Sequence, residues 1–152
     1  MNTLFEPELN DLESLAEIFN AYRVFYHQEP NIDLARKFIH ERITQKDSKI
    51  FIKKDELNNI LGFIQLYPTF SSVSAGKAWI LNDLYVHEMN RRQGIAEELM
   101  QHVIQFGKNT NAKYLALETH FDNVPAQTLY KNMGFIEQDK TCLLYTSPSP
   151  RD

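Results

Sequence analysis

The chain has 152 residues, of which 43% are hydrophobic and 24% charged, and this length and composition are typical of a single soluble globular domain. The formal net charge of −4 does not favour general binding of nucleic acid, and a mild acidic bias instead suits a cationic ligand such as an amine. No apolar run approaches the roughly 20 residues of a membrane span, and the N-terminus lacks the basic and apolar regions of a signal peptide. We therefore expect a cytoplasmic protein that does not bind membranes.

Two amphipathic helices are expected in the N-terminal third of the chain. Asn10 or Asp11 can cap the first helix, which runs to about Tyr26 with an apolar stripe along one side. Pro30 breaks the chain, and Asn31 can cap the second helix, whose apolar residues also repeat at helical spacing.

A pair of strands is expected after these helices. Segments 49–53 and 60–67 have the composition of strands, and the polar residues 55–59 between them are turn formers. We expect Pro68 to end the second strand. The small residues of 70–76 should then form a loop over the functional site.

The centre of the chain reads as a strand, a tight basic turn and a long helix. Residues 79–86 are rich in β-branched, aromatic and aliphatic side chains, and a helical stripe of apolar residues begins near Ile95. Farther on, 113–118 reads as another strand. The last helix is expected to have Pro125 in its first turn and to end at Gly134 in the left-handed conformation.

The junction between the central strand and its helix predicts an anion site. The first amides of a helix lack internal acceptors and carry partial positive charge. Gly94 allows close approach of a ligand, Ala96 is nearly as small, and Arg91 and Arg92 add two full charges. A pyrophosphate is the expected ligand of such a site, although an ordinary turn with solvated arginines is the alternative. The G-x-x-x-x-G-K-[ST] and G-x-G-x-x-G patterns of other nucleotide sites are absent.

Two motifs resemble those of one enzyme family. R-R-Q-G-I-A, at 91–96, is similar to the [Q/R]-x-x-G-x-[G/A] signature of the GNAT N-acetyltransferases, which holds the pyrophosphate of acetyl-coenzyme A (acetyl-CoA). N-V-P-A-Q-T-L-Y-K-N-M-G-F, at 123–135, resembles that family's N-x-x-A-x-x-L-Y-x-x-x-G-F. The resemblance spans roughly residues 4–140 and is nearest to the diamine and polyamine acetyltransferase branch.

The resemblance implies an α/β fold of the GNAT type, a mixed central sheet flanked by about four helices. A splayed pair of strands would form the acetyl-CoA cleft. Leu84 and Val86 would contact the pantetheine arm through their main chain, their side chains being only core, and Asn123 would contact it as well. Tyr130 would contact the cofactor and protonate the departing thiolate. The pyrophosphate would be bound by Arg91, Arg92, Gln93, Gly94, Ile95 and Ala96.

The group that removes the amine proton is left open between two carboxylates. In the resembled branch a Glu-Asp pair tends to precede the aromatic residues of the central strand, and here the pair is Asn82-Asp83. Asn82 cannot accept a proton, so Asp83 and Glu118 are the candidates for catalysis, and all three are candidates for acceptor binding. Because strand residues alternate, Asn82 and Asp83 are expected to face opposite sides. By the same resemblance the wall of the acceptor pocket would include Tyr22, Arg23, Tyr26 and His27.

The last residues have a different character. Residues 142–152 look like a translated sequencing-library adapter, with a Ser-Pro-rich disordered tail as the alternative. We therefore expect an acetyltransferase domain at 1–141 and a non-native tail at 142–152. The tail replaces the closing strand of the family, which is either missing or imitated by residues 143–145. The only cysteine, Cys142, lies in it.

The sequence thus predicts an acetyl-CoA-dependent N-acetyltransferase. Its acceptor would be a primary amine of a small molecule, polyamine-like or amino-acid-like, attacking the acetyl group directly in a ternary complex. A protein-lysine or N-terminal acetyltransferase and a non-catalytic acyl-CoA sensor are the alternatives. No metal site is expected, since the histidines are scattered and His87-Glu88 lacks the second His of H-E-x-x-H. A homodimer would be in keeping with the family.

Overall fold

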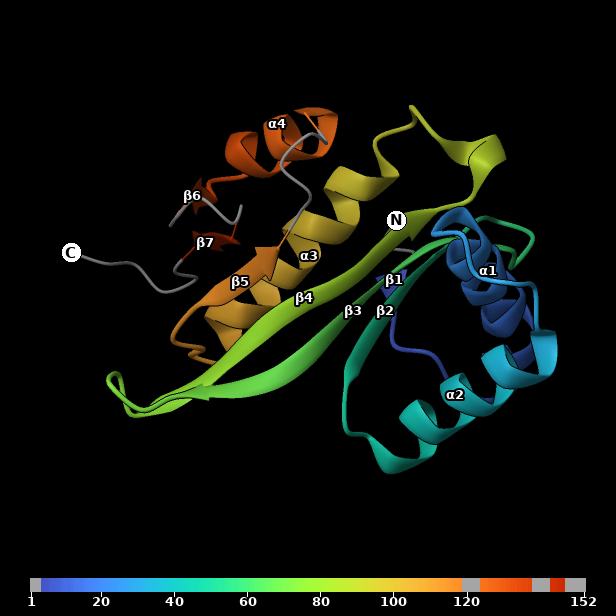
Figure 1. Cartoon of the computed structure of the whole chain (residues 1–152), viewed down its shortest axis with the longest axis horizontal. Coiled ribbons are helices and arrows are strands. Elements are labelled where there is room, and N and C mark those ends of the chain that lie inside the picture. The colour runs from blue at the N-terminus through green and yellow to red at the C-terminus, as the bar shows by residue number, and fades with distance from the viewer. Residues whose placement is uncertain (1–3, 119–123, 138–142, 147–152) are drawn as a thin grey trace.

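A long antiparallel pair of strands, β3 (Ile60–Ser71) and β4 (Gly76–Val86), forms the middle of the fold (Figure 1). The computed structural model describes residues 4–118, 124–137 and 143–146, and in this part of the chain seven strands form one sheet in the order β1-β2-β3-β4-β5-β7-β6. Among the strand pairs of the described residues, β4 with β5 is parallel and the others are antiparallel. The remaining strands are β1 (Leu4–Phe5), β2 (Lys49–Lys54), β5 (Leu115–Glu118), β6 (Ile136–Glu137) and β7 (Leu143–Thr146).

Four α-helices in the described residues cover the two faces of this sheet (Figure 1). They are α1 (Leu12–Phe25), α2 (Ile32–Gln45), α3 (Ile95–Asn109) and α4 (Val124–Asn132). Asn31 caps α2 as expected, because its Oδ1 accepts a hydrogen bond from the amide of Leu34 at 3.1 Å. Gly134 follows α4 with a φ of 102°, the left-handed conformation predicted for it. None of the helices described is long and apolar enough to cross a membrane.

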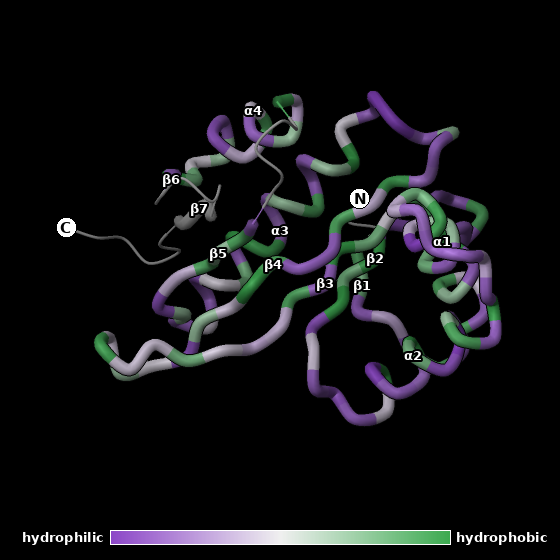
Figure 2. The backbone as a smooth tube through the Cα atoms, viewed as in Figure 1, coloured by the Kyte–Doolittle hydropathy of each residue, from purple (hydrophilic) through white to green (hydrophobic). Residues whose placement is uncertain are grey.

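The core lies in two layers, one on each side of the sheet. On one side the apolar stripe of α3, including the fully buried Leu99, Met100 and Val103, packs on the central strands. On the other side α1 and α2 contribute Leu15 and Ile39 to a second cluster. Figure 2 shows hydrophilic and hydrophobic residues alternating along the helices, and a largely hydrophilic connection between β4 and α3. The sheet is therefore held between two helical layers while that connection remains available to a ligand.

A β-bulge interrupts the pairing of β3 with β4 at Asn82. Gln65 pairs with Asp83 and Leu66 with Leu81, which leaves Asn82 as an extra residue in β4. Leu81 therefore packs with the α3 layer, whereas Asp83 contacts α1 through Tyr22. The expectation that Asn82 and Asp83 face opposite sides is wrong, because regular alternation ends at the bulge. Their side chains are instead hydrogen-bonded, with Asn82 Nδ2 donating to Asp83 Oδ2 at 3.1 Å.

Pro68 does not end β3, contrary to the sequence prediction. The strand continues to Ser71, and Pro68 pairs with Trp79 of β4. The pairing of β2 with β3 reaches only Leu66, so the imino nitrogen of Pro68 lies beyond the region where a third strand would need its amide. The predicted loop at 70–76 is accordingly reduced to the tip of a long hairpin.

The parallel pairing of β4 with β5 stops before β4 ends. Its last paired residues are Leu81 and Leu117, and β4 continues for five residues to Val86. The two strands therefore separate near the bulge, as expected for the splayed pair. On the other side of β5, β7 pairs antiparallel with it. The sequence left open whether the closing strand is missing or imitated by residues 143–145, and the structure has a strand there, β7. Residues 142 and 147–152 lie outside the described residues.

Candidate functional site

The connection from β4 to α3 places several unpaired amides around an open position. Gly94 is the residue before α3 and has a φ of 77°, in the left-handed region that glycine tolerates best. A Cβ built on Gly94 would have no atom within 4 Å, so the space in front of it is free. The first bond of the helix runs from the amide of Glu98 to the carbonyl of Gly94, which leaves the amides of Ile95, Ala96 and Glu97 without intrahelical acceptors.

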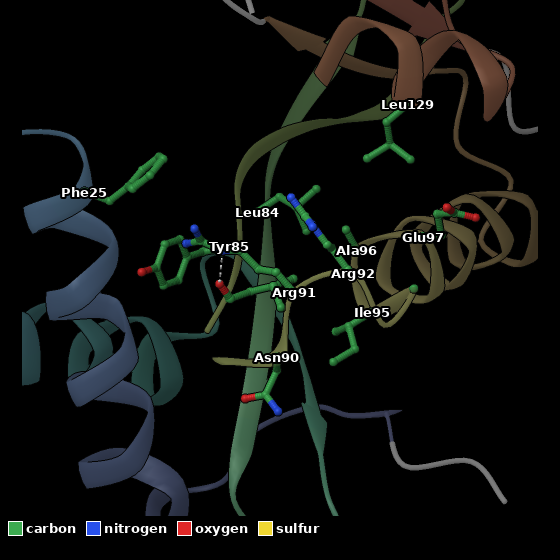
Figure 3. A pocket seen from close by; sticks show the side chains of 12 residues that line it. Phe25, Leu84, Tyr85, Asn90, Arg91, Arg92, Ile95, Ala96, Glu97 and Leu129 are labelled. Atoms are coloured by element: carbon green, nitrogen blue, oxygen red, sulfur yellow. Dashed lines mark hydrogen bonds between the residues drawn. The ribbon is translucent and has the colours of Figure 1, made fainter. Parts of the chain in front are cut away.

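A cavity of about 390 Å³ opens over these amides (Figure 3). It lies between the end of β4, the first turn of α3, the C-terminal end of α1 and the described part of α4. Seven of the residues predicted to bind a cofactor line it: Leu84, Val86, Arg91, Arg92, Gly94, Ile95 and Ala96. Gln93 is exposed and does not line it, and Asn123 lies outside the described residues. The cavity is also lined by Phe25, Tyr85, Asn90, Glu97 and Leu129, which the motifs do not predict.

Leu84 borders this cavity, and its side chain also packs against the α3-side core, the place that the sequence predicted for it. The separation of β4 from β5 leaves the half-buried Leu84 at the edge of that core with space beside it. Val86 is buried, at 9% exposure, and behaves as core even though it borders the cavity.

Arg91, in the connection between β4 and α3, is held against the C-terminal end of α1. Its guanidinium lies over the rings of Phe25 and Tyr85, 5.4 and 5.3 Å from their centroids, and its Nε donates to the carbonyl of Val86 at 3.1 Å (Figure 3). These contacts fix one side of the guanidinium and leave its other nitrogens for an anion. Arg92, with a φ of 66°, has no ion pair with any described residue. The two arginines therefore differ, because Arg91 is held by contacts whereas Arg92 is exposed and has no ion pair with a described residue.

Next to the cavity wall, on the α1 side of the sheet, a buried carboxylate gathers three hydrogen-bond donors. Asp83 is only 6% exposed. Its Oδ1 accepts from the hydroxyl of Tyr22 at 2.6 Å, and its Oδ2 accepts from Gln65 Nε2 at 2.7 Å and from Asn82 Nδ2. Gln65 is fully buried, and its Oε1 accepts from the hydroxyl of Ser48 at 2.8 Å. The carboxylate forms no ion pair with a described residue, so its charge is balanced by neutral donors alone.

Aromatic rings surround the Tyr22 end of this network. The Tyr22 ring lies 5.2 to 5.6 Å from the rings of Tyr26, Phe63 and Tyr85. Burial, together with the hydrogen bond to Asp83 and the charge of that carboxylate, raises the pKa of the Tyr22 phenol well above its ordinary value. Tyr22 therefore stays protonated at physiological pH and acts as a donor to Asp83.

Residues 12–135 match the acetyltransferase (GNAT) family. The chain belongs to this family. An uncharacterized N-acetyltransferase of Bacillus subtilis is 36% identical to it over 132 residues, 87% of this chain and 88% of the relative. A probable acetyltransferase of Haemophilus influenzae is 31% identical over 115 residues, 76% of this chain and 79% of the relative. The predicted family and enzyme class are thus confirmed, and the protein is an N-acetyltransferase.

Solved structures of acetyltransferases share the fold. One probable acetyltransferase is 40% identical and superposes with a TM-score of 0.87, covering 92% of this chain and 93% of its own. A predicted acetyltransferase of Clostridium acetobutylicum, crystallised with acetyl-CoA, is 17% identical with a TM-score of 0.71, covering 90% of this chain and 91% of its own. The predicted GNAT fold, a mixed sheet between helices, is confirmed.

The remaining candidate residues of this GNAT chain, Tyr130, Tyr26 and Glu118, do not line the cavity. Tyr130 of α4 is half-buried beside the α3-side core, with its ring 6.1 Å from that of Phe135. Burial, with a smaller effect of Tyr26, raises the pKa of Tyr130 to about 12. Tyr26 is 56% exposed at the end of α1. Glu118, the exposed last residue of β5, pairs with Leu143 of β7, and its side chain forms no hydrogen bond or ion pair with a described residue.

The structure therefore brings Asn82, Asp83 and Tyr22 into one cluster and leaves Glu118 outside it. Gln65 is the member of this cluster that the motifs do not predict. Its signal in the sequence is a polar residue inside the apolar run of β3, where an amide needs a hydrogen-bond partner to be buried.

Proposed function

We propose that this N-acetyltransferase transfers the acetyl group of acetyl-CoA to a primary amine of a small molecule, by direct attack in a ternary complex. The observation that carries the proposal is the cavity over the N-terminus of α3, bounded by the separated end of β4. It combines free amides, an open glycine and two arginines at one end with an apolar wall at the other. A pyrophosphate joined to a long uncharged arm needs this combination.

The residues present fit acetyl-CoA. The amides of Ile95 and Ala96 and the guanidinium of Arg92 would bind the pyrophosphate, and Gly94 leaves room for its oxygens. The exposed edge of β4 beyond Leu81 offers main-chain groups to the pantetheine arm, because β5 no longer pairs with it there. The complex of the Clostridium acetobutylicum protein with acetyl-CoA supports the same use of this fold.

The chemistry requires a positioned amine, a place for its proton and an acid for the thiolate. We assign the acid to Tyr130, whose phenol remains protonated until about pH 12. Asp83 and Glu118 are the two carboxylates that serve the acceptor. Asp83 is a buried carboxylate held by three donors beside the cleft, whereas Glu118 is exposed at the end of β5.

The acceptor is proposed to be cationic and small, polyamine-like or amino-acid-like. The donors around the buried Asp83 are all neutral, so a cationic acceptor would supply an ion pair that the described residues do not. The rings of Tyr22, Tyr26 and Tyr85 beside it suit the alkyl part of an amine. A lysine side chain of a protein presents the same group, so a peptide acceptor is the second candidate.

The test is release of coenzyme A, followed with a thiol reagent, against a panel of polyamines, amino acids and lysine-containing peptides. Turnover with a polyamine or amino acid and weaker turnover with the peptides supports the proposal. Preference for the peptides would replace the small acceptor by a protein. Calorimetric binding of acetyl-CoA without turnover on any acceptor would mean that the chain is an acyl-CoA sensor.

A further inference from the structure

A second cavity, of about 350 Å³, lies at the opposite end of β4 and α3 from the cavity proposed for acetyl-CoA (Figure 1). It is formed by the connection between α2 and β2, the first half of β4 and the last turn of α3. The two cavities share no lining residue. Phe106 lines the second and Ile95 the first, and these residues are about 16 Å apart along the axis of α3. The second cavity is therefore a separate place on the molecule.

Three lysines from different elements line this second cavity, and two of them are held over aromatic rings. Lys77 Nζ of β4 lies 4.6 Å from the centroid of the Trp79 ring. Lys49 Nζ of β2 lies 5.7 Å from the centroid of the Phe106 ring. The third, Lys46, directly follows α2. A ring attracts the charge of an ammonium group, but the three N–H donors of that group still need oxygen acceptors.

The carboxylates of the protein do not cancel the positive charge of this lining. Asp47, the lining carboxylate among the described residues, has its Oδ1 2.8 Å from Arg42 Nε. Lys49 forms an ion pair with Glu6 at 3.0 Å. The other two lysines of the lining form no ion pair with any residue in the described ranges. An excess of two positive charges therefore remains at the cavity, in a chain whose net charge is −4.

The hydroxyl groups of the lining are already used by the protein. Ser48 donates its hydroxyl proton to Gln65 Oε1 at 2.8 Å. Thr110 Oγ1 donates to the carbonyl of Phe106, also at 2.8 Å. Much of the remaining wall is apolar and includes Pro68 and the ring of Phe106. A ligand that fits this cavity has oxygen acceptors for the ammonium groups and an apolar body for the wall.

We propose that this cavity binds a small organic anion, an oxyanion group on an apolar body, through the ammonium groups of Lys46 and Lys77. Two uncompensated ammonium groups would repel the cationic amine proposed as acceptor, so the ligand is of a different class. Lysine presents a point charge with rotatable donors, which suits a carboxylate or a phosphate group alike. The inference does not depend on the proposed function, because the cavity has no residue in common with the acetyl-CoA site.

The test uses Trp79, the only tryptophan of the chain, whose indole N–H signal in ¹H–¹⁵N NMR spectra reports on this cavity. Benzoate and benzamide, which are similar in size and differ in charge, are titrated into the full chain at constant ionic strength. The proposal expects a saturable shift of the indole signal with benzoate and at least about tenfold weaker binding of benzamide, the usual effect of a hydrogen bond to a charged group. Lys46→Gln and Lys77→Gln should each weaken benzoate about tenfold.

Lys37→Gln is the matched control. Lys37 is exposed on α2, forms no ion pair with a described residue and does not line the cavity, so the variant loses the same charge at another place. Its affinity for benzoate should equal that of wild type. Lys46→Gln alters an exposed side chain, so it keeps the test decisive should Lys77→Gln disturb the contact with Trp79.

Absence of a saturable shift, equal affinities for benzoate and benzamide, or benzoate affinity unchanged in both cavity variants would overturn the proposal. An equal loss in Lys37→Gln would overturn it as well, because the overall charge would then explain the binding. Loss of benzoate binding on saturation with acetyl-CoA would assign the anion to the other cavity, with the same consequence. Acetyl-CoA affinity and coenzyme A release decide the proposed function separately.

Discussion

Substitutions at Gly94 separate the effect of backbone conformation from the effect of charge in the connection between β4 and α3. Gly94→Ala adds a Cβ to a residue with a φ of 77° but meets no atom within 4 Å, so only backbone strain is expected. The left-handed conformation costs an L-residue about 1–2 kcal/mol, and the free energy of unfolding should fall by that amount. Acetyl-CoA affinity should change little, because the helix amides keep their places.

Gly94→Gln and Gly94→Glu add the same strain and nearly the same volume, and they differ by one charge. A carboxylate about 4–6 Å from a phosphate at an effective dielectric constant near 20 is repelled by about 3–4 kcal/mol per unit charge. Gly94→Glu should therefore bind acetyl-CoA about 10²–10³-fold more weakly than Gly94→Gln. Calorimetry gives the affinities, and thermal unfolding confirms that both variants are folded.

Equal affinities of the Gln and Glu variants would refute this reasoning, since the anion would then lie elsewhere. The dependence on salt gives an internal check. The difference between the two variants should shrink as ionic strength rises, because screening shortens the range of the repulsion.

Three further outcomes are expected. Tyr130→Phe should lower the rate of the chemical step by about 10²–10⁴-fold with little change in acetyl-CoA affinity, and a wild-type rate in stopped flow would remove Tyr130 from catalysis. Because burial raises the pKa of Tyr130 from 10.0 to about 12, the neutral phenol is favoured in the folded state, and stability should be full below pH 10 and fall toward pH 12. Alkaline unfolding curves should show a shallower fall in Tyr130→Phe. Leu99→Ala, at a fully buried position of α3, should cost about 2–5 kcal/mol in urea unfolding, and a loss below 1 kcal/mol would contradict the described core.

Much of the proposed acetyl-CoA site was predictable, because its residues are neighbours in the sequence. Gly94, Arg91 and Arg92 stand next to one another in sequence, and a strand–turn–helix brings such neighbours together whatever the rest of the fold does. The contact of Arg91 with Phe25 was not predictable, because the packing of α1 against this connection joins residues about 65 positions apart.

The hydrogen-bond partners of Asp83 depend on how β4 is paired with its neighbours, and the sequence of one strand does not encode that register. Asp83 could be named as a candidate, but its partners Gln65 and Tyr22 come from another strand and a helix. Alternation along β4 predicted opposite faces for Asn82 and Asp83, and one extra residue in the ladder was enough to invalidate it. The same non-local pairing explains why Pro68 lies within β3, since the extent of β2 decides whether its missing amide matters.

The bulge also separates Asn82, which bonds to Asp83, from the residues of β4 that build the core. Deleting Asn82 would restore a regular ladder with Asp83 still opposite Gln65, and Leu84 and Val86 would keep facing the α3 layer. Position 82 can therefore be lost, regained or exchanged without altering the phase of the residues that build the core. A change at position 82 is therefore expected to alter the hydrogen bonding of Asp83 while the core residues of β4 keep their places.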